Sequence, residues 1–380
     1  MSTFGSLEHS VEETTKSEET AKISAKKDDQ KPDAAAAAAD DDDDDGEVQV
    51  YILLGQSNML GMGHVGNYPD DLTKDGTLQC AVHSKGLYPY LLEEDPNNSS
   101  TSSSSWATSP TVRNVRVMDS KKQGQDFDVY QNEFLTIHNG TKIGPEVGIG
   151  HVLEQRASTK PILLLKSCIG NRSLGWDLLP PGSSRYVYGD DMYAGYKDSP
   201  DHWPQHEPKP DPINWYAGKQ YDSDIAHCQA VLTDLSTYYP GATSYKIVGF
   251  FWWQGDKDRY TEAYGKRYET NLVRLIHQLR ADFRSPEAKF VLATLGQTEL
   301  DDTKTDNNTD QTILQAMLAV DGNAGNYPDF VGNVATVYSH PYSKGGASNG
   351  HYNGNAETYM NIGEAMGQAM VELVPNTNYK

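Results

Sequence analysis

The sequence has few cysteines and no long apolar run. Its 380 residues include three cysteines, Cys80, Cys168 and Cys228, and no C-x-x-C pair. We therefore expect neither a disulfide framework nor a cysteine-bound zinc site, and we expect the three cysteines to be buried free thiols. No run of about eighteen apolar residues is present, and no basic stretch precedes an apolar segment at the N-terminus. The sequence therefore predicts neither a membrane span nor a signal peptide, and we expect a soluble protein, cytoplasmic by default.

Basic residues are outnumbered by acidic ones. Lys and Arg together number 32, against 53 Asp and Glu, which gives a formal net charge of -21 at pH 7. A surface of this sign does not favour nucleic acid or an anionic membrane as the main partner. A neutral or weakly charged substrate, either a small molecule or a glycan, fits this composition better.

The first 46 residues differ in composition from the rest of the chain. Glu, Lys, Ser and Thr predominate there, followed by an alanine run at 34–39 and an aspartate run at 40–45. Because such a segment cannot bury enough apolar surface to fold, residues 1–46 are predicted to form a disordered acidic tail. Residues 47–375 are then expected to form one catalytic domain, with irregular segments at about 64–144 and 171–215 interpreted as insertions.

Apolar strand-like runs alternate with amphipathic helical stretches along the domain. Strands are expected at residues 48–54, 161–168, 245–253, 288–295 and 331–339, with a further short strand-like run at 112–118. Helices are expected at residues 144–156, 217–239, 259–283, 311–320 and 356–373. This alternation indicates an α/β fold, in which a central parallel sheet of about five strands is covered by helices on both faces.

One serine stands where the first of these strands ends. The run VQVYILLG stops at Gly55, and Ser57 follows it, with Met59 and Leu60 suited to open a helix. Open α/β sheets bind ligands at the carboxyl ends of their strands, so the Ser57 hydroxyl is expected at such an edge. This stretch alone is equally compatible with a Ser-Asn turn without chemistry, and its G-x-S-x-M pattern departs from the G-x-S-x-G of α/β-hydrolases.

A nucleophilic serine needs a general base within hydrogen-bond reach and donors for the oxyanion. Histidine supplies such a base near neutral pH. His351 lies between the strand at 331–339 and the last helix, so it can return to the edge of the sheet where Ser57 is expected. His340, which directly follows the same strand, is the rival candidate.

Five short motifs resemble those of the sialate O-acetylesterase-like branch of the SGNH hydrolases, which includes carbohydrate acetylesterases and acetylxylan esterases. In chain order they are GQSNMLGMG, IGPEVGIGH, KSCIGNRSLGW, WWQGDKD and HYNGNAETYMNIGEAMG. Each motif is weak by itself, but all five occur in the order of the family, over about residues 48–374. The resemblance implies a flavodoxin-like three-layer sandwich, the SGNH hydrolase fold, and a mechanism that needs no cofactor and no metal.

The resemblance also implies roles for individual residues. The implied catalytic residues are the nucleophile Ser57, the oxyanion-hole glycine Gly170, the amide donor Gln254 and the base His351. Other residues of the same motifs, Gln56, Asn58, Asn171 and Trp176, are candidates for substrate binding. The Trp176 ring is suited to stack on a pyranose face, although a packing role fits its position equally well.

One position departs from the family pattern. Aspartate usually stands three residues before the histidine, and Ser348 occupies that position here. A carboxylate at this place would orient the imidazole and stabilise its protonated form. Either a main-chain carbonyl near Asn349 orients His351, which gives a Ser-His dyad, or Asp256 or Asp258 reaches the imidazole from the end of the strand at 245–253. We favour the carbonyl, with Asp256 bracing its own loop.

Two other patterns have ordinary structural explanations. His202 and His206 have the spacing of helical metal ligands, but Pro204 between them favours a loop, and no metal site is predicted. Trp252 and Trp253 point to opposite faces of a strand, so at least one of them is expected in the core.

These observations predict a carboxylic ester hydrolase, namely a serine esterase that removes O-acetyl groups from a carbohydrate through an acyl-enzyme on Ser57. Two alternatives belong to other classes. An acetyltransferase would use a sugar hydroxyl in place of water, and a non-catalytic carbohydrate-binding homologue is compatible with the missing aspartate. The joint presence of the serine, glycine, glutamine and histidine favours catalysis.

Overall fold

The computed structural model describes residues 46–93, 105–157, 160–300 and 309–374. All of them lie in one compact unit, Asp44–Lys380. The predicted acidic tail, apart from Gly46, lies outside the described residues. Within the described part of the chain, no helix combines the length and the hydropathy that a membrane span requires.

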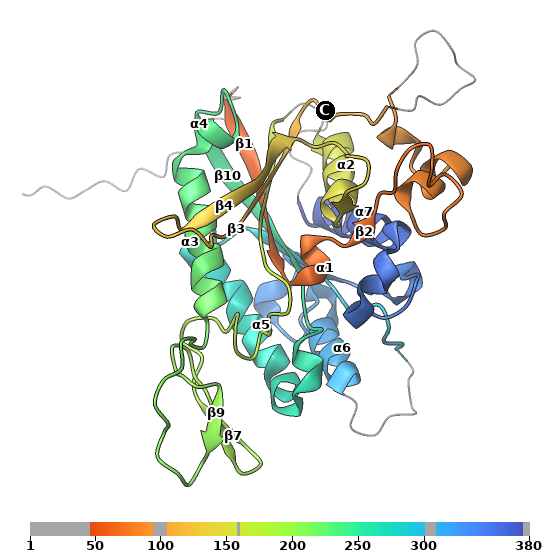
Figure 1. The fold of residues 1–380 in the computed structure, drawn as a ribbon. Helices are drawn as coiled ribbons and strands as arrows, with labels where there is room; N and C mark the ends of the chain where they lie inside the picture. The colour runs from red at the N-terminus through yellow and green to blue at the C-terminus, as the bar shows by residue number, and fades with distance from the viewer. Residues whose placement is uncertain (1–45, 94–104, 158–159, 301–308, 375–380) are drawn as a thin grey trace, which may run out of the picture. The chain divides into compact units, whose positions relative to one another are not determined.

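A seven-stranded sheet forms the centre of this unit (Figure 1). Across the sheet the strands are β12 (Val334–Val337), β11 (Lys289–Ala293), β10 (Ser244–Trp253), β1 (Glu47–Gly55), β6 (Ile162–Ser167), β3 (Val112–Asp119) and β4 (Phe127–Phe134). Neighbouring strands are parallel except for the antiparallel pair β3 and β4. The α/β prediction is confirmed, and all five predicted strands are present.

The strand number differs from the prediction because the segment at about 64–144 contributes β3 and β4 to the sheet. The run at 112–118 had a strand-like sequence and forms most of β3. In contrast, β4 is an edge strand without a fully buried residue, so its sequence lacks the apolar run that marks the central strands.

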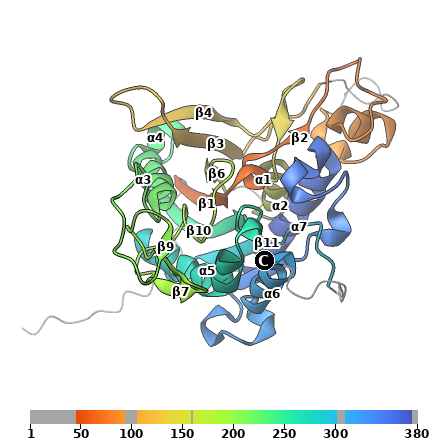
Figure 2. The same ribbon diagram turned by 60° about the horizontal axis from the view of Figure 1, so that its bottom comes forward.

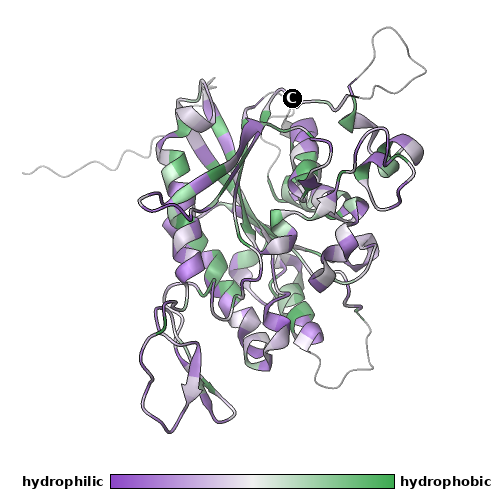
Figure 3. Ribbon diagram, in the orientation of Figure 1, coloured by the Kyte–Doolittle hydropathy of each residue, from purple (hydrophilic) through white to green (hydrophobic). Residues whose placement is uncertain are grey.

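Helices cover both faces of the sheet, as Figure 2 shows. They are α2 (Glu146–Ala157), α3 (Lys219–Thr233), α4 (Leu235–Tyr238), α5 (Glu262–Asp282), α6 (Thr309–Ala319) and α7 (Ala356–Leu373). Side chains of β1 alternate between the two cores: Ile52 packs in the cluster that includes residues of α3, α5 and α6, and Leu53 in the cluster that includes residues of α2 and α7. The predicted three-layer sandwich is therefore confirmed. In Figure 3 hydrophobic and hydrophilic residues share each long helix, as expected when one side packs on a sheet.

Shorter elements surround the sandwich. Strands β2 (Gly63–His64) and β5 (Lys142–Ile143) pair with each other, and β7 (Tyr186–Tyr188), β8 (Asp191–Tyr193) and β9 (His202–Pro204) form an antiparallel arm within the segment 171–215 (Figure 1). The short helices are α1 (Ser57–Leu60), η1 (Cys80–Ser84), η2 (Pro89–Leu91), η3 (Asp258–Tyr260), η4 (Gly322–Ala324), η5 (Pro328–Phe330), η6 (His340–Tyr342) and η7 (Ser348–Gly354).

Strand β1 occupies the point where the strand order reverses. It pairs with β6 on one side and with β10 on the other, so the chain leaves it in both directions along the sheet. In open α/β sheets the crevice at such a point is where ligands bind. The segments that follow β1, β6 and β10 therefore form the candidate site.

Candidate active site

Ser57 is the first residue of α1 and lies directly beyond the end of β1. Gly55 makes this close turn possible: its φ is 147°, and a Cβ atom there would lie 2.4 Å from the carbonyl oxygen of Trp253. The helix begins at Ser57 rather than at Met59 and has a single turn. Ser57 is only 6% exposed, so its hydroxyl is held in a confined position at the edge of the sheet.

Gly170, which follows β6, lies beside Ser57. A Cβ atom built on Gly170 would stand 3.5 Å from the Ser57 Cβ atom. Within the described residues, the main-chain N–H groups of Ser57 and Gly170 have no hydrogen-bond partner. Two free N–H groups next to a serine hydroxyl are the kind of donors that an oxyanion requires.

Gln254 follows β10 and is already engaged with the protein. Its Nε2 atom lies 2.6 Å from Oδ2 of Asp258 and 2.8 Å from the carbonyl oxygen of Arg172. The same Nε2 lies 3.1 Å from Oε1 of Gln56, and Gln254 Oε1 accepts a hydrogen bond of 2.8 Å from the Tyr268 hydroxyl. Two amide hydrogens thus face three acceptors, so Gln254 must release one of them to donate to a bound substrate.

Asp258, one of the two candidate acids, holds this arrangement together. Its carboxylate accepts hydrogen bonds from Gln254 and from the main-chain N–H groups of Leu174 (2.9 Å) and Gly175 (2.7 Å). Complete burial raises the pKa of Asp258 to about 7, against the opposing effect of these three donors. Within the described residues, no hydrogen bond joins the Asp258 carboxylate to His351. Its contacts connect the loop after Gly170 to Gln254.

Asp256, the other candidate acid, contacts the loop of His351 indirectly. Its Oδ1 atom accepts a hydrogen bond of 2.6 Å from the Ser348 hydroxyl and lies 3.4 Å from Nη1 of Arg259. Ser348 is completely buried and stands three residues before His351. The Asp256 carboxylate is therefore hydrogen-bonded to Ser348, the residue at the position where the family usually has an aspartate. Neither Asp256 nor Ser348 is hydrogen-bonded to the His351 imidazole.

His351 lies in η7, on a backbone that few residue types adopt. Three consecutive residues, His351, Tyr352 and Asn353, have φ values of 53°, 53° and 52°. Such left-handed conformations are disfavoured for residues other than glycine and persist only where the surroundings hold them. The Tyr352 ring stacks on Trp253, and its hydroxyl accepts a hydrogen bond of 3.2 Å from the Gly296 N–H.

The loop of His351 is linked to α1 through Tyr359. The Tyr359 hydroxyl lies 3.5 Å from the carbonyl oxygen of His351 and 3.3 Å from Oδ1 of Asn58. Asn58 is the residue after Ser57, so one tyrosine connects the backbone of the candidate base to the turn of the candidate nucleophile. Among the described side chains, Ser57 and His351 are not hydrogen-bonded to each other.

The rival base, His340, has other neighbours. Its Nδ1 atom lies 2.8 Å from the carbonyl oxygen of Gly296, and its Nε2 atom lies 3.7 Å from Oε1 of Glu299. The ring also stacks on Tyr338. These contacts place His340 against the loop after β11, whereas η7 packs against α1.

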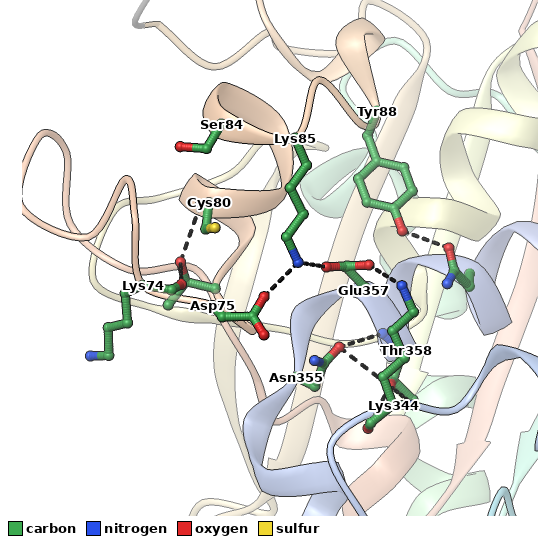
Figure 4. A network of polar contacts seen from close by, with 12 residues as sticks. Lys74, Asp75, Cys80, Ser84, Lys85, Tyr88, Lys344, Asn355, Glu357 and Thr358 are labelled. Carbon is green, nitrogen blue, oxygen red and sulfur yellow. Dashed lines mark hydrogen bonds and ion pairs between the residues drawn. The ribbon is translucent and has the colours of Figure 1, made fainter.

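A buried carboxylate anchors both ends of the segment that carries His351 (Figure 4). Glu357, at the start of α7, binds the ammonium groups of Lys85 (2.5 Å) and Lys344. Lys85 also contacts Asp75 at 2.5 Å, and the backbone of Lys344 exchanges two hydrogen bonds with the Thr358 hydroxyl. Burial alone would raise the pKa of Glu357, but the two lysines hold it below its usual value. The network ties residues 75–85 to the loop before η7.

Sequence reasoning missed a buried ion pair under α1. Lys166 of β6 is completely buried and lies 2.5 Å from Oε2 of Glu146, whose other oxygen accepts the Gly144 N–H at 3.0 Å. The Lys166 ammonium also donates to the carbonyl oxygen of Leu60, the last residue of α1, at 3.3 Å. The signal was a single lysine within the apolar run ILLLKS, because a buried charge requires a partner. This pair fixes the end of the turn that begins with Ser57.

The candidate substrate-binding residues differ in accessibility. Asn171 is exposed, whereas Gln56 and Asn58 are each only 1% exposed and bind other side chains. Trp176 is half-buried and packs against a small apolar cluster that includes Trp203. Of these four candidates, Asn171 and part of Trp176 are thus open to a ligand in this structure.

The remaining candidates are accounted for by packing. Trp252 and Trp253 are both completely buried, one in each core, so the expectation of at least one core tryptophan is confirmed. His202 lies on β9 and stacks on Tyr193. The described residues contain no group of three or more His, Cys, Asp or Glu side chains that could hold a metal ion.

Comparisons with known structures give matches at low sequence identity. A protein from Arabidopsis thaliana is 16% identical, with a TM-score of 0.45, covering 86% of this chain and 98% of its own. NanS is 14% identical, with a TM-score of 0.39, covering 77% and 78%. A carbohydrate acetylesterase from Xanthomonas citri is 12% identical, with a TM-score of 0.43, covering 84% and 55%. No curated protein matches the sequence significantly.

A family profile gives a more specific match. The family described as carbohydrate esterase, sialic acid-specific acetylesterase, matches residues 201–372. The matched region contains Gln254, Asp256, Asp258 and His351, and it begins after Ser57 and Gly170. Residues 201–372 are therefore similar to the sialic acid-specific acetylesterase family of carbohydrate esterases, which supports the resemblance of this chain to the sialate O-acetylesterase-like branch of the SGNH hydrolases.

Proposed function

We propose that the protein is a serine esterase that hydrolyses O-acetyl esters of a carbohydrate through an acyl-enzyme on Ser57. The family match supports a carbohydrate O-acetylesterase in general terms. The observation that carries the finer assignment is the position of Ser57, with Gly170 beside it and with the N–H groups of both residues unpartnered among the described residues, at the ends of β1 and β6.

In the first step, His351 accepts the proton of the Ser57 hydroxyl while the serine oxygen attacks the ester carbonyl. The developing oxyanion is stabilised by the N–H groups of Ser57 and Gly170, with Gln254 as a third donor once it releases one of its present acceptors. His351 then protonates the departing sugar oxygen, and the acetyl group remains on Ser57.

In the second step, His351 removes a proton from a water molecule, which attacks the acetyl-serine carbonyl. The intermediate collapses with release of acetate, and the proton returns to the Ser57 oxygen. The two side chains are not hydrogen-bonded to each other in this structure, so the proposal requires the imidazole to approach Ser57 when the substrate binds. Catalytic hydrogen bonds often tighten only when substrate binds.

An O-acetylated glycan tests this proposal. Wild-type protein is expected to release free acetate in proportion to the loss of ester, and Ser57→Ala and His351→Ala to release almost none while remaining folded. Full activity of Ser57→Ala would refute the assignment. Adding an excess of a non-acetylated sugar tests the acetyltransferase alternative: transfer would yield a new acetylated sugar at the expense of acetate. Absence of any ester loss in the wild type would favour the non-catalytic homologue.

A further inference from the structure

A cavity of about 420 Å³ lies on the outer side of the helix pair α2 and α7, apart from Ser57. Residues of η2 and η6 complete its walls, and none of the candidate catalytic residues lines it. We call it the α2–α7 cavity. Its volume is within the range of sites that bind small molecules. Figure 1 shows α2 and α7 next to each other on one side of the sheet.

Polar side chains of α7 face this cavity with part of their hydrogen-bonding capacity already used. The Tyr88 hydroxyl donates to Oδ1 of Asn361 at 2.5 Å, and the Tyr90 hydroxyl donates to Oε1 of Glu364. The other atoms of these groups, Nδ2 of Asn361 and Oε2 of Glu364, have no partner within the described residues. One donor and one acceptor are thus held in fixed orientations for a ligand.

The α2 side of the cavity has the same property. Nε2 of Gln155 lies 2.8 Å from the His151 ring, which leaves Oε1 of Gln155 without a partner among the described residues. On α7, Nε2 of Gln368 donates to Glu372 at 2.9 Å and leaves its own Oε1 similarly available. Groups fixed on one side by the protein lose little conformational freedom when they bind a ligand on the other.

Two tyrosines supply aromatic surface. Tyr90 is half-buried and stacks on the His151 ring, with centroids 3.3 Å apart and planes 7° apart, so its orientation is fixed. Tyr342 is 40% exposed. Tyrosine rings combine an apolar face with a polar hydroxyl, and such rings suit the alternating C–H and O–H groups of a sugar.

The chemistry of the lining excludes several other ligands. No Lys or Arg occurs among the described residues that line the cavity, so an anionic group would find no counter-charge there. Glu364 is the one carboxylate of that lining; burial raises its pKa, and one of its oxygens already accepts the Tyr90 hydroxyl, which argues against a cation site. Aliphatic surface is limited to Val152 and Ala365, too little for a lipid chain.

We propose that the α2–α7 cavity is a second carbohydrate-binding site, which takes a neutral sugar residue through the aromatic rings and the free amide and carboxyl atoms. The acetylated glycan would then contact the protein at two places, the catalytic edge and this cavity. This binding is independent of the chemistry at Ser57, so it can be measured without esterase activity.

The test uses the full-length chain carrying Ser57→Ala, with xylotriose and N-acetyllactosamine as neutral probes and N-acetylneuraminate as an anionic probe. Saturation-transfer NMR titrations give the dissociation constants. The variants are Tyr342→Ala combined with Gln155→Ala in the cavity, and Tyr245→Ala, an equally exposed tyrosine on β10, as the matched control. Because a ring contact and a hydrogen bond are removed, binding of at least one neutral probe is expected to weaken about tenfold in the cavity variant.

The control variant is expected to bind the neutral probes with the same dissociation constants as the protein that carries Ser57→Ala alone. The proposal is overturned if no neutral probe binds, if the cavity variant binds neutral probes as tightly as the control, or if its loss is confined to N-acetylneuraminate. Introduced into the wild-type background, the cavity substitutions are expected to leave turnover of 4-nitrophenyl acetate unchanged. Failure of the esterase proposal would appear in that assay and would leave the binding result intact.

Discussion

The Ser348 hydroxyl donates a hydrogen bond of 2.6 Å to Oδ1 of Asp256. This contact joins the end of β10 to η7, the loop that carries His351, without involving the imidazole. That a main-chain carbonyl orients His351 stays a prediction, as does the role of Asp256 in bracing its own loop. Asp256→Asn should lower turnover about 10- to 100-fold, by analogy with the loss of supporting residues at metal sites. His351→Ala should remove nearly all activity.

The size of the loss separates the two roles. Removing a carboxylate that orients a catalytic histidine can lower turnover by about 10⁴. A loss of that size in Asp256→Asn would identify Asp256 as the third member of a triad. Asp258→Asn provides a comparison, because its contacts are to Gln254 and to the loop after Gly170. If His340→Ala, rather than His351→Ala, silenced a folded enzyme, the base would be misassigned.

The ion pair between Lys166 and Glu146 is predicted to position the turn of Ser57. Lys166→Met leaves a buried carboxylate without its counter-charge, which should cost about 3–5 kcal/mol of unfolding free energy. Combining it with Glu146→Gln removes both charges and should recover part of that loss. Urea denaturation measures the free energy of unfolding of both variants. The labelling rate of Ser57 by an active-site probe reports on the position of the turn.

For this pair, a purely structural role would leave the labelling rate of the folded double variant equal to that of the wild type. We expect a slower rate, because the double variant lacks the ammonium group that donates to the Leu60 carbonyl. Equal stabilities of the Lys166→Met single variant and the double variant would contradict the assigned coupling.

Glu357→Gln tests the network of Figure 4. The carboxylate is nearly inaccessible and faces two lysines, so its neutralisation should lower stability by about 1–3 kcal/mol. Asp75→Asn, which changes an exposed partner of Lys85, should lower stability much less than Glu357→Gln, because solvent screens this ion pair. The pKa of Glu357 is lowered in the folded state, so its stabilising effect is present above the unfolded pKa and disappears as pH falls through the folded value. A difference in stability between Glu357→Gln and Asp75→Asn that persisted in strong acid would contradict this account.

Asp258 should make stability depend on pH in the opposite sense. Its pKa is raised from an ordinary value of about 4 to about 7, so between these values the folded state binds a proton that the unfolded state lacks. Its contribution to stability is therefore full below about pH 4 and declines as pH rises to about 7. Melting temperatures measured from pH 4 to pH 8 should show a smaller decline in Asp258→Asn. An identical slope in both proteins would show that Asp258 does not retain its proton.

The central strands could be predicted from the sequence because they are buried on both faces and therefore apolar throughout. Leu163 and Leu164 of β6, for example, point to opposite cores. The edge strand β4 could not be predicted in this way, because its side chains are partly exposed and its sequence has no marked pattern. The same reasoning applies to the arm of β7, β8 and β9, whose strands are three residues long.

The site was only partly predictable. Ser57 and Gly170 are brought together because each follows a neighbouring parallel strand, a relation that the alternation of elements already implied. The hydrogen-bond partners of Asp256 and Asp258 could not be predicted from the sequence. Both residues lie just after β10, but Asp258 binds the loop after Gly170 and Asp256 binds Ser348. Such choices depend on side-chain packing between segments far apart in the sequence.

The nucleophile is the central claim, and covalent labelling tests it most directly. The wild-type protein is treated with a fluorophosphonate probe, digested, and the labelled peptide is identified by mass spectrometry. We predict a single labelled site at Ser57, no labelling in a folded Ser57→Ala variant, and slow labelling in His351→Ala. Labelling of a different serine, or labelling that persists in Ser57→Ala, would contradict the account.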